Sequence, residues 1–280
     1  PSLGLNYGLS DLNWGGLSGR GAVSVYGEYT RFESDPLLTG QPNGERAMAV
    51  ATISHRLQTP GWFIEPRARL HSTQYNFAQP LANGRRSASR AVPTVSLDSG
   101  LVFERDASYF GRAFLQTLEP RAYFTWTPYR DQSFLPNYDS AATDFNLATI
   151  YSDNVFTGND RISDTRGVTL GVSSRLLDPG TGAEIVRLGI AQRYLLADQD
   201  VTLPGGTPVQ ERFSDVLLAA RVQWTPRWLF DTTFQYNPSS NESVRTTVSA
   251  RYTPGPYRVL SAAWRLQRGA SEQFDIGWQW

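Results

Sequence analysis

The sequence predicts an all-β protein, an antiparallel transmembrane β-barrel with about fourteen strands that form part of a larger barrel. From Arg212 to Trp280, five successive segments place an apolar residue at every second position. A strand points alternate side chains to opposite faces, so this spacing separates an apolar face from a polar one. No stretch shows a helical period, and no apolar run approaches the ~20 residues that a transmembrane helix needs. If the chain meets a membrane, it does so with strands.

The five segments assign named residues to each face. The apolar face carries, among others, Trp224, Phe234, Val248 and Trp264, and we expect these side chains to point outward into acyl chains. Arginines occupy the intervening positions, and a face that carries guanidinium groups must be hydrated. We therefore expect the lumen to be lined by Arg175, Arg221, Arg251 and Arg265.

Upstream of Arg212 the alternation is less regular but still predicts strands. Its apolar positions fall at 3–9, 23–29, 48–52, 95–103, 122–126, 168–176 and 188–194. Turns rich in Gly, Pro, Asn, Asp and Ser join these segments, and such residues supply turn dihedrals. Pro66 and Pro120 stand inside strand-like runs, where a missing N–H should weaken local pairing or produce a bulge.

Four strand ends share a Thr-Pro dipeptide, which ends pairing because proline cannot donate to a ladder. Three of them follow an aromatic residue, the kind of residue that is enriched at membrane interfaces. If Trp224 and Tyr252 precede turns at one end, counting strands backward places Trp126 at that end and Gln58 at the other.

A soluble β-sandwich is the competing fold, since it also alternates apolar and polar residues. Three features favour the barrel: Trp and Tyr near strand ends, small residues on the apolar face, and no sandwich-like turn spacing. The segment from Arg212 to Trp224 also has room for the ~9–11 residues of a tilted transmembrane strand. We treat residues 1–280 as one barrel segment. Because it starts at Pro1 without a signal peptide and ends within a strand pattern, we expect it to be a part of something larger.

Composition excludes several functional classes. Lys plus Arg equals Asp plus Glu at 26 each, and all 26 cations are arginine, so no basic excess points to nucleic acid. The absence of cysteine removes thiolate and disulfide chemistry. Two histidines, His55 and His71, have no partner at metal-ligand spacing. We expect no cofactor and no metal.

Two groups of residues could still carry chemistry. Six aspartates cluster in sequence, and they could hold calcium or act as acid and base, although ordered turns are the favoured interpretation: Asp131, Asp139, Asp144, Asp153, Asp160 and Asp164. Ser173 and Ser174 would need His55 or His71 nearby in space to act as hydrolytic nucleophiles. We expect no enzymatic activity, with a barrel lipase or protease as the enzymatic alternative.

Four short blocks resemble the lipopolysaccharide-assembly outer-membrane proteins, also called organic-solvent-tolerance proteins. The blocks are Leu118-Glu119-Pro120-Arg121, Pro128-Tyr129-Arg130-Asp131-Gln132-Ser133, Asn137-Tyr138-Asp139-Ser140 and Gly158-Asn159-Asp160-Arg161-Ile162. They are followed by residues 168–175, VTLGVSSR, and the resemblance is best from about Leu118 to Arg193.

The resemblance implies a very large barrel in the outer membrane of a Gram-negative bacterium, of which this chain is an interior or C-terminal part. It implies a translocon component that inserts lipopolysaccharide into the outer leaflet, with this segment forming wall and loops. The implied partners are a lipoprotein plug (LptE-like), lipopolysaccharide, outer-membrane lipids and, through a missing N-terminal domain, periplasmic transport-bridge proteins. The favoured interpretation of the lumen arginines is that they solvate the pore without a specific ligand. The other interpretation is that they contact acidic groups of the plug or lipid A phosphates, for which arginine offers a forked donor. The alternative is a porin or a plugged transport barrel for other solutes.

Overall fold

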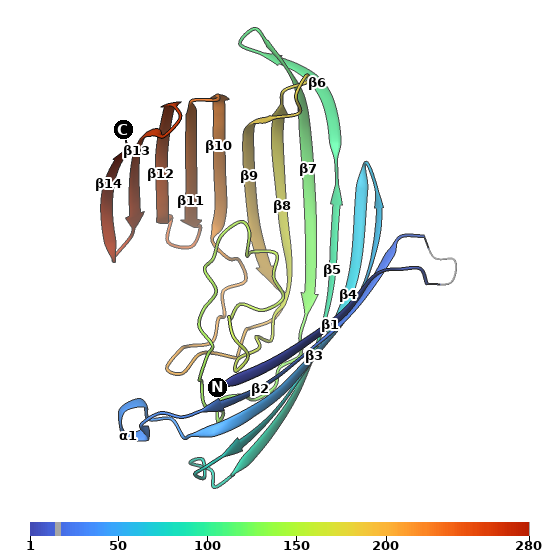
Figure 1. Cartoon of the computed structure of the whole chain (residues 1–280), viewed down its shortest axis with the longest axis vertical. Coiled ribbons are helices and arrows are strands. Elements are labelled where there is room, and N and C mark those ends of the chain that lie inside the picture. Colours follow the sequence, from blue (N-terminus) through green and yellow to red (C-terminus); the bar gives the residue numbers. More distant parts are fainter. Residues whose placement is uncertain (15–17, 280) are drawn as a thin grey trace.

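The computed structural model describes residues 1–14 and 18–279, which form one curved antiparallel sheet with fourteen strands (Figure 1). Trp280, the last residue of the predicted alternation, lies outside the described residues. The strands are β1 (Ser2–Leu12), β2 (Arg20–Phe32), β3 (Gly44–Thr59), β4 (Trp62–Phe77), β5 (Ser87–Leu101), β6 (Phe103–Tyr109), β7 (Arg112–Trp126), β8 (Arg166–Leu177), β9 (Glu184–Leu195), β10 (Val216–Thr225), β11 (Trp228–Asn237), β12 (Glu242–Gly255), β13 (Arg258–Gln267) and β14 (Ser271–Gln279). The predicted all-β fold with about fourteen strands is confirmed. Strands that follow one another in sequence pair in the sheet, except that β5 and β6 both pair with β7, and β1 and β14 form the two edges.

Helix is confined to one turn. The helix α1 (Pro36–Thr39) has Asp35 as its N-cap and a left-handed Gly40 at its C-terminus. No helix in the described residues has the length and apolar character needed to cross a membrane.

The two prolines predicted to weaken pairing, Pro66 and Pro120, interrupt pairing without shifting the register. Pro66 lies opposite Leu97 in the β4–β5 ladder, and the β3–β4 ladder resumes in the same register on either side of it. Beside Pro120, β5 ends and β6 begins, yet the pairs Gly100–Arg121 and Phe103–Leu118 keep one register along β7. The expected local weakening is therefore present at both prolines, and neither produces a bulge.

The two ends of the sheet differ in the length of their connections. Short turns at 60–61, 110–111, 226–227 and 256–257 occupy one end, and the segments 33–43, 78–86, 127–165 and 196–215 occupy the other. Gln58, Trp224 and Tyr252 precede turns at the short-turn end, whereas Trp126 lies at the long-loop end. The predicted placement of Trp126 and Gln58 was wrong, because only β8 and β9 separate β7 from β10, which makes β7 and β10 antiparallel.

Two clusters of buried apolar residues lie between the sheet and the segment 127–165, which we call the inner loop. Leu135 of the loop packs with Tyr75, Phe77 and Ala88 of the sheet. Farther along, Ile150 of the loop packs with Ala191 and Leu217. The opposite sheet face leaves large apolar side chains exposed, including Leu188, Phe230 and Val248. One face of the sheet therefore holds the loop, and the other is apolar and uncovered over most of its length.

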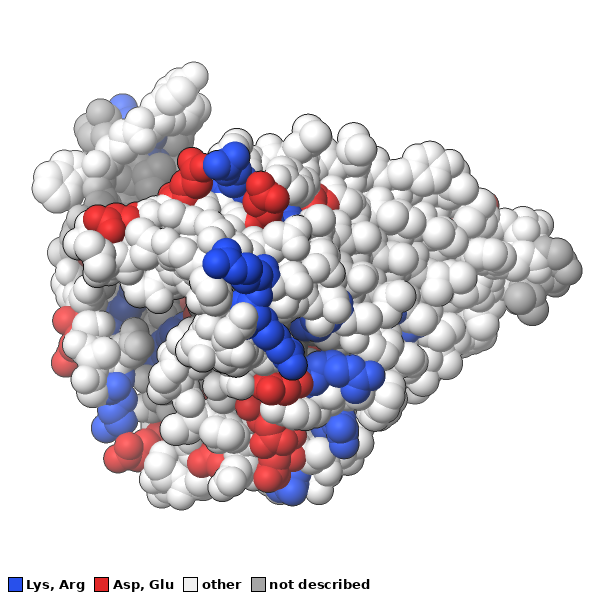
Figure 2. Space-filling model, turned by 90° about the horizontal axis from the view of Figure 1, so that it is seen from below, with Lys and Arg blue, Asp and Glu red and all other residues white. Residues whose placement is uncertain are grey.

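Charged side chains follow the same division. Viewed toward the long-loop end, acidic and basic residues are interspersed where the loops lie (Figure 2). The flank that runs toward the turn between β1 and β2 is almost wholly uncharged in the same view.

Candidate functional site: the anchored inner loop

The inner loop begins where β7 ends and returns to the start of β8. Its base is closed by a backbone hydrogen bond from Thr127 to the carbonyl of Thr165, 2.9 Å long. Asp164, near this base, accepts hydrogen bonds from the backbone N–H groups of Asp200 and Val201. These two residues belong to the segment 196–215, which we call the second loop. The two loops are thus tied to each other as well as to the sheet.

A buried guanidinium on β3 fastens the inner loop to the sheet. Arg46 is 1% exposed and donates to Asp160 at 2.9 Å and to Asp139 at 2.7 Å. It also donates to Glu28 on the neighbouring strand β2 at 3.0 Å. One side chain from the sheet therefore binds two carboxylates of the inner loop and one of the sheet. Removing one partner of a buried ion pair strongly destabilises a protein, because the other charge stays buried without compensation.

Asp160 is fully buried and makes hydrogen bonds with groups other than Arg46. One of its oxygens accepts from the hydroxyl of Tyr75 at 2.8 Å, and the other accepts from the backbone N–H groups of Tyr138 and Asp139 at 2.7 and 3.0 Å. Its carboxylate therefore joins the two halves of the inner loop to β3 and β4. A buried charge is tolerated only when it is paired and hydrogen-bonded in this way.

The electrostatics of the neighbouring groups fit a closed network. Burial alone would raise the pKa of Asp139, but hydrogen bonds from Arg46 and from the backbone of Asn159 outweigh it, so that this pKa lies below its ordinary value. Burial raises the pKa of Tyr138 to about 12. At neutral pH Asp139 is therefore an anion facing Arg46, and Tyr138 is a neutral hydrogen-bond donor to the carbonyl of Pro42.

Two more buried arginines of the sheet bind backbone carbonyls of the inner loop. Arg90 on β5 donates to the carbonyls of Asn159 and Asp160 at 2.6 and 2.7 Å and to the side chain of Gln132 at 2.7 Å. Arg193 on β9 donates to the carbonyls of Ile150 and Ser152. Arginine suits this role because its planar fork reaches several acceptors at once.

The turn that positions Asp160 depends on a glycine. Gly158 has a φ of +69°, a conformation that L side chains rarely adopt. A Cβ atom at this position would lie 2.3 Å from the carbonyl oxygen of Asp139. Only glycine allows the loop segments around Asp139 and Gly158 to approach so closely. This close approach lets Asn159 donate its N–H to the side chain of Asp139 at 2.9 Å.

The Glu-Pro-Arg block of β7 forms ion pairs on the loop-bearing face. Glu119 accepts from Arg175 at 2.6 Å. Arg121 makes a bidentate contact with Asp98, with distances of 2.9 and 2.7 Å, and its guanidinium lies over the ring of Tyr151. Pro120 stands between them and is paired with Val172 in register.

The other residues of the resembling blocks have local roles. Asp131 accepts from the backbone and hydroxyl of Ser133, and Arg130 donates to the carbonyl of Tyr129. All four of these block residues are exposed. Asn137 exchanges two hydrogen bonds with the backbone of Ser140. Arg161 is 2% exposed and donates to the carbonyls of Leu135, Pro136, Asp160 and Thr202.

The three predicted lumen arginines of the last strands lie on the face of the sheet that bears the loops. Arg245, on the same strand β12 as Arg251, pairs with Asp144 of the inner loop at 2.7 Å. Arg221 lies 3.9 Å from Asp231, and Arg265 pairs with Asp275. Arg251 is exposed, opposite Leu229 and Ser261. Whether these side chains and Arg175 face an aqueous lumen stays a prediction.

The candidates for catalysis and metal binding are dispersed. Among the described residues no group of three or more acidic or histidine side chains could hold a metal ion. Asp153 pairs with Arg69, and the other five aspartates have the partners given above. His71 contacts Asn159 and Thr73, and His55 contacts the carbonyl of Ser18. Ser174 donates to the carbonyl of Thr117.

The residues of the sheet that hold the loop were not predicted from the sequence: Glu28, Arg46, Tyr75, Arg90 and Arg193. Each stands at an alternating position of a strand, where a charged residue looks like one more hydrated side chain. The available signal was the spacing of Arg46 from Met48, which places a charge on the same face as a large apolar residue. That spacing does not name a partner 114 residues away.

Comparisons with known proteins agree on one family. The chain matches the family described as LptD, LPS transport system D, over residues 1–275. A relative from Polaromonas sp., named LPS-assembly protein LptD, is 59% identical over 100% of this chain and 34% of its own length. Proteins of the same name from Acidovorax sp. and Aromatoleum aromaticum are 58% and 39% identical, over 94% and 100% of this chain and 33% and 35% of their own lengths.

The chain thus spans about a third of the length of these curated relatives. Among solved structures, the FpvAI–pyocin S2 complex covers 98% of this chain and 52% of the solved chain, at 11% identity and a TM-score of 0.36. That likeness is too low to support an argument.

Proposed function

The chain belongs to the LptD family, LPS transport system D, and we propose that it forms wall and interior of an outer-membrane barrel that inserts lipopolysaccharide into the outer leaflet. The observation that carries the proposal is the match of the family over residues 1–275, together with relatives named LPS-assembly protein. The fold supports the proposal, because the strands divide an apolar face from a face that bears anchored loops.

The outer membrane of a Gram-negative bacterium is the location that we propose. Outer-membrane barrels have short periplasmic turns and longer external loops, so the inner loop and the second loop belong to the external end. The exposed apolar residues of the other face then contact lipid, and the free edges of β1 and β14 pair with the rest of the barrel, since an unpaired edge is not tolerated in hydrocarbon.

The inner loop is the part of this chain with a distinct task in that barrel. It is held by Arg46, Arg90 and Arg193 from three strands, which fixes it to the wall. We propose that it keeps the interior closed to solutes. In this proposal the exposed arginines Arg221 and Arg251 face an interior that holds a lipoprotein plug (LptE-like) and through which lipopolysaccharide moves. Periplasmic transport-bridge proteins would join through the part of the relatives that this chain does not span.

A pair of substitutions on β12 tests which face meets lipid. Val248→Arg is expected to cost about 2–4 kcal/mol, because it places a guanidinium in the hydrocarbon near its midplane. Ser249→Arg points to the other face, where Asp231 lies directly opposite, and should be tolerated. The measurement is the heat stability of the full-length parent in lipid, read as the temperature at which the barrel unfolds on a gel. Equal loss in both variants would contradict the assignment of faces.

The function is tested in a strain in which the full-length parent is depleted. Loss of newly made lipopolysaccharide from the cell surface, restored by the intact gene, is the expected result. A porin or a solute transporter would instead leave lipopolysaccharide at the surface and show conductance in a planar bilayer. That combination would overturn the proposal.

A further inference from the structure

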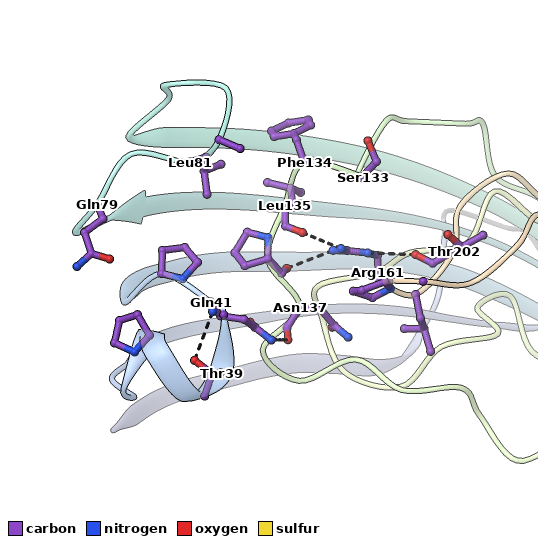
Figure 3. A pocket seen from close by; sticks show the side chains of 18 of the residues that line it. Thr39, Gln41, Gln79, Leu81, Ser133, Phe134, Leu135, Asn137, Arg161 and Thr202 are labelled. Carbon is purple, nitrogen blue, oxygen red and sulfur yellow. Dashed lines mark hydrogen bonds between the residues drawn. The ribbon is translucent and has the colours of Figure 1, made fainter.

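A cavity at the long-loop end lies beside the network around Arg46 and Asp160, and Arg161 adjoins both. The cavity has a volume of about 720 Å³ and lies between α1, the connection after β4, the inner loop and the second loop (Figure 3). Small-molecule sites commonly measure about 300–1,000 Å³, so this volume admits a ligand of one or a few rings. Four separate segments of chain contribute to it, and all four are tied to the sheet or to one another.

The walls of the cavity are stiff and apolar in large part. Five prolines line it, drawn from all four segments: Pro36, Pro42, Pro80, Pro136 and Pro204. Proline fixes φ, so these walls lose little freedom when a ligand binds. Leu81 and Phe134 add flat apolar surface, and both pack against the buried cluster around Tyr75. The cavity is therefore preformed.

Apart from Arg161, the polar side chains that line the cavity are neutral. Gln79, Asn137 and Thr202 are amides and a hydroxyl, and Figure 3 shows them spread around its rim. Within residues 1–14 and 18–279, the side chains of Gln79 and Thr202 have no hydrogen-bond partner, so both can bind a ligand. Arg161 is the single cation among the lining residues, and four of its N–H groups are already donated to the carbonyls of Leu135, Pro136, Asp160 and Thr202.

These features favour an uncharged sugar over a phosphate or a fatty acid. A pyranose has apolar C–H faces, which fit proline and phenylalanine walls, and hydroxyl edges, which fit amides and hydroxyls. A phosphate would need a charge-assisted donor. The guanidinium of Arg161 is occupied, and that of Arg85 lies over the ring of Phe134 and is not among the lining groups. An acyl chain would leave the amide and hydroxyl groups without partners.

We propose that this cavity binds neutral sugar units, and that these are sugars of lipopolysaccharide at the external rim. The second clause rests on the proposed function, whereas the first does not. The site would hold the saccharide for a short time as it leaves the barrel, through contacts with Gln79, Thr202 and Phe134. The predicted lumen arginines, Arg175, Arg221, Arg251 and Arg265, are not among its lining residues.

Saturation-transfer NMR on the full-length parent in detergent tests the site directly. The probes are neutral oligosaccharides of glucose, galactose, mannose and N-acetylglucosamine, with glucose 6-phosphate as the charged comparison. We expect saturation transfer to at least one neutral probe and a signal at least fivefold weaker for glucose 6-phosphate. Failure of every neutral probe, or preference for the phosphate, would overturn the proposal.

Variants locate the binding in the cavity. Gln79→Trp fills it from an exposed loop position and should reduce the signal about tenfold, and Thr202→Val, which removes one hydroxyl, should reduce it severalfold. Gln210→Trp, the same change at an exposed position of the second loop outside the cavity, should leave the signal unchanged. A signal that survives Gln79→Trp would place the sugar elsewhere. Surface lipopolysaccharide in cells carrying Gln79→Trp is measured separately, so loss of sugar binding is distinguished from loss of transport.

Discussion

Replacing Asp160 by alanine is expected to release the inner loop from the sheet, at a cost of about 3 kcal/mol, the lower end for breaking a buried ion pair. The lower end applies because Arg46 keeps Glu28 and Asp139 as partners. The substitution also leaves the hydroxyl of Tyr75 and two backbone N–H groups without their acceptor. Hydrogen–deuterium exchange of the full-length parent is the measurement, and the amides of residues 138–161 should lose about a hundredfold in protection, the equivalent of 3 kcal/mol.

A matched control and a double substitution make the Asp160 result specific. Asp198→Ala removes an exposed carboxylate that pairs with Arg212, and it should change stability by less than about 1 kcal/mol. Arg46→Leu combined with Asp160→Ala should cost about 1–3 kcal/mol less than the sum of the single changes, as expected for residues in direct contact. Additive costs, or unchanged protection in Asp160→Ala, would show that the pair does not hold the loop. Because the inner loop is proposed to keep the interior closed, cells that carry Asp160→Ala alone should also admit large antibiotics.

Gly158→Ala is expected to have the second-largest effect, about 2–4 kcal/mol. About 1–2 kcal/mol comes from placing an L residue at positive φ, and the rest from the contact between the new Cβ and the carbonyl oxygen of Asp139. The loop can relieve the clash only by moving Asp139 away from Arg46. Hydrogen–deuterium exchange over residues 138–161 again measures the loss.

Gly182→Ala separates the two contributions. Gly182 has a φ of +72°, and no atom lies within 4 Å of the place that a Cβ would take, so alanine there carries the backbone cost alone. We expect its effect to stay near 1–2 kcal/mol and to be confined to the turn after β8. If Gly158→Ala cost no more stability than Gly182→Ala, the close approach of the loop segments around Asp139 and Gly158 would not contribute to stability.

The alternation of apolar residues was sufficient to predict the sheet and the division of its faces in the last five strands. Period-two patterning is a local property, and residues such as Phe230, Thr232 and Phe234 display it without reference to the rest of the chain. Turn chemistry located most strand ends, and Pro120 correctly marked a weak point in pairing. The predicted end of the sheet for Trp126 was wrong. Counting strands backward from Trp224 adds up the errors of every uncertain segment in between.

The inner loop shows why only part of the candidate site could be predicted from the sequence. Asp139, Asp160 and Arg161 could be singled out from their resembling blocks, but their roles depend on Arg46 and Arg90, which are far away in sequence. In the sheet these arginines are spaced like any polar residue of a strand. Which of them is buried depends on where a 39-residue connection folds back, and no local pattern encodes that path.

Site-specific photo-crosslinking along β12 tests the central claim, that one face of the sheet meets lipid while the other encloses the loops. A benzophenone side chain is introduced singly at positions 246 to 251 of the full-length parent in living cells. The account predicts that positions 246, 248 and 250 crosslink to membrane lipid, either phospholipid or outer-leaflet lipopolysaccharide, and that 247, 249 and 251 crosslink to protein inside the barrel. Phospholipid adducts at all six positions, or at the odd ones alone, would contradict it.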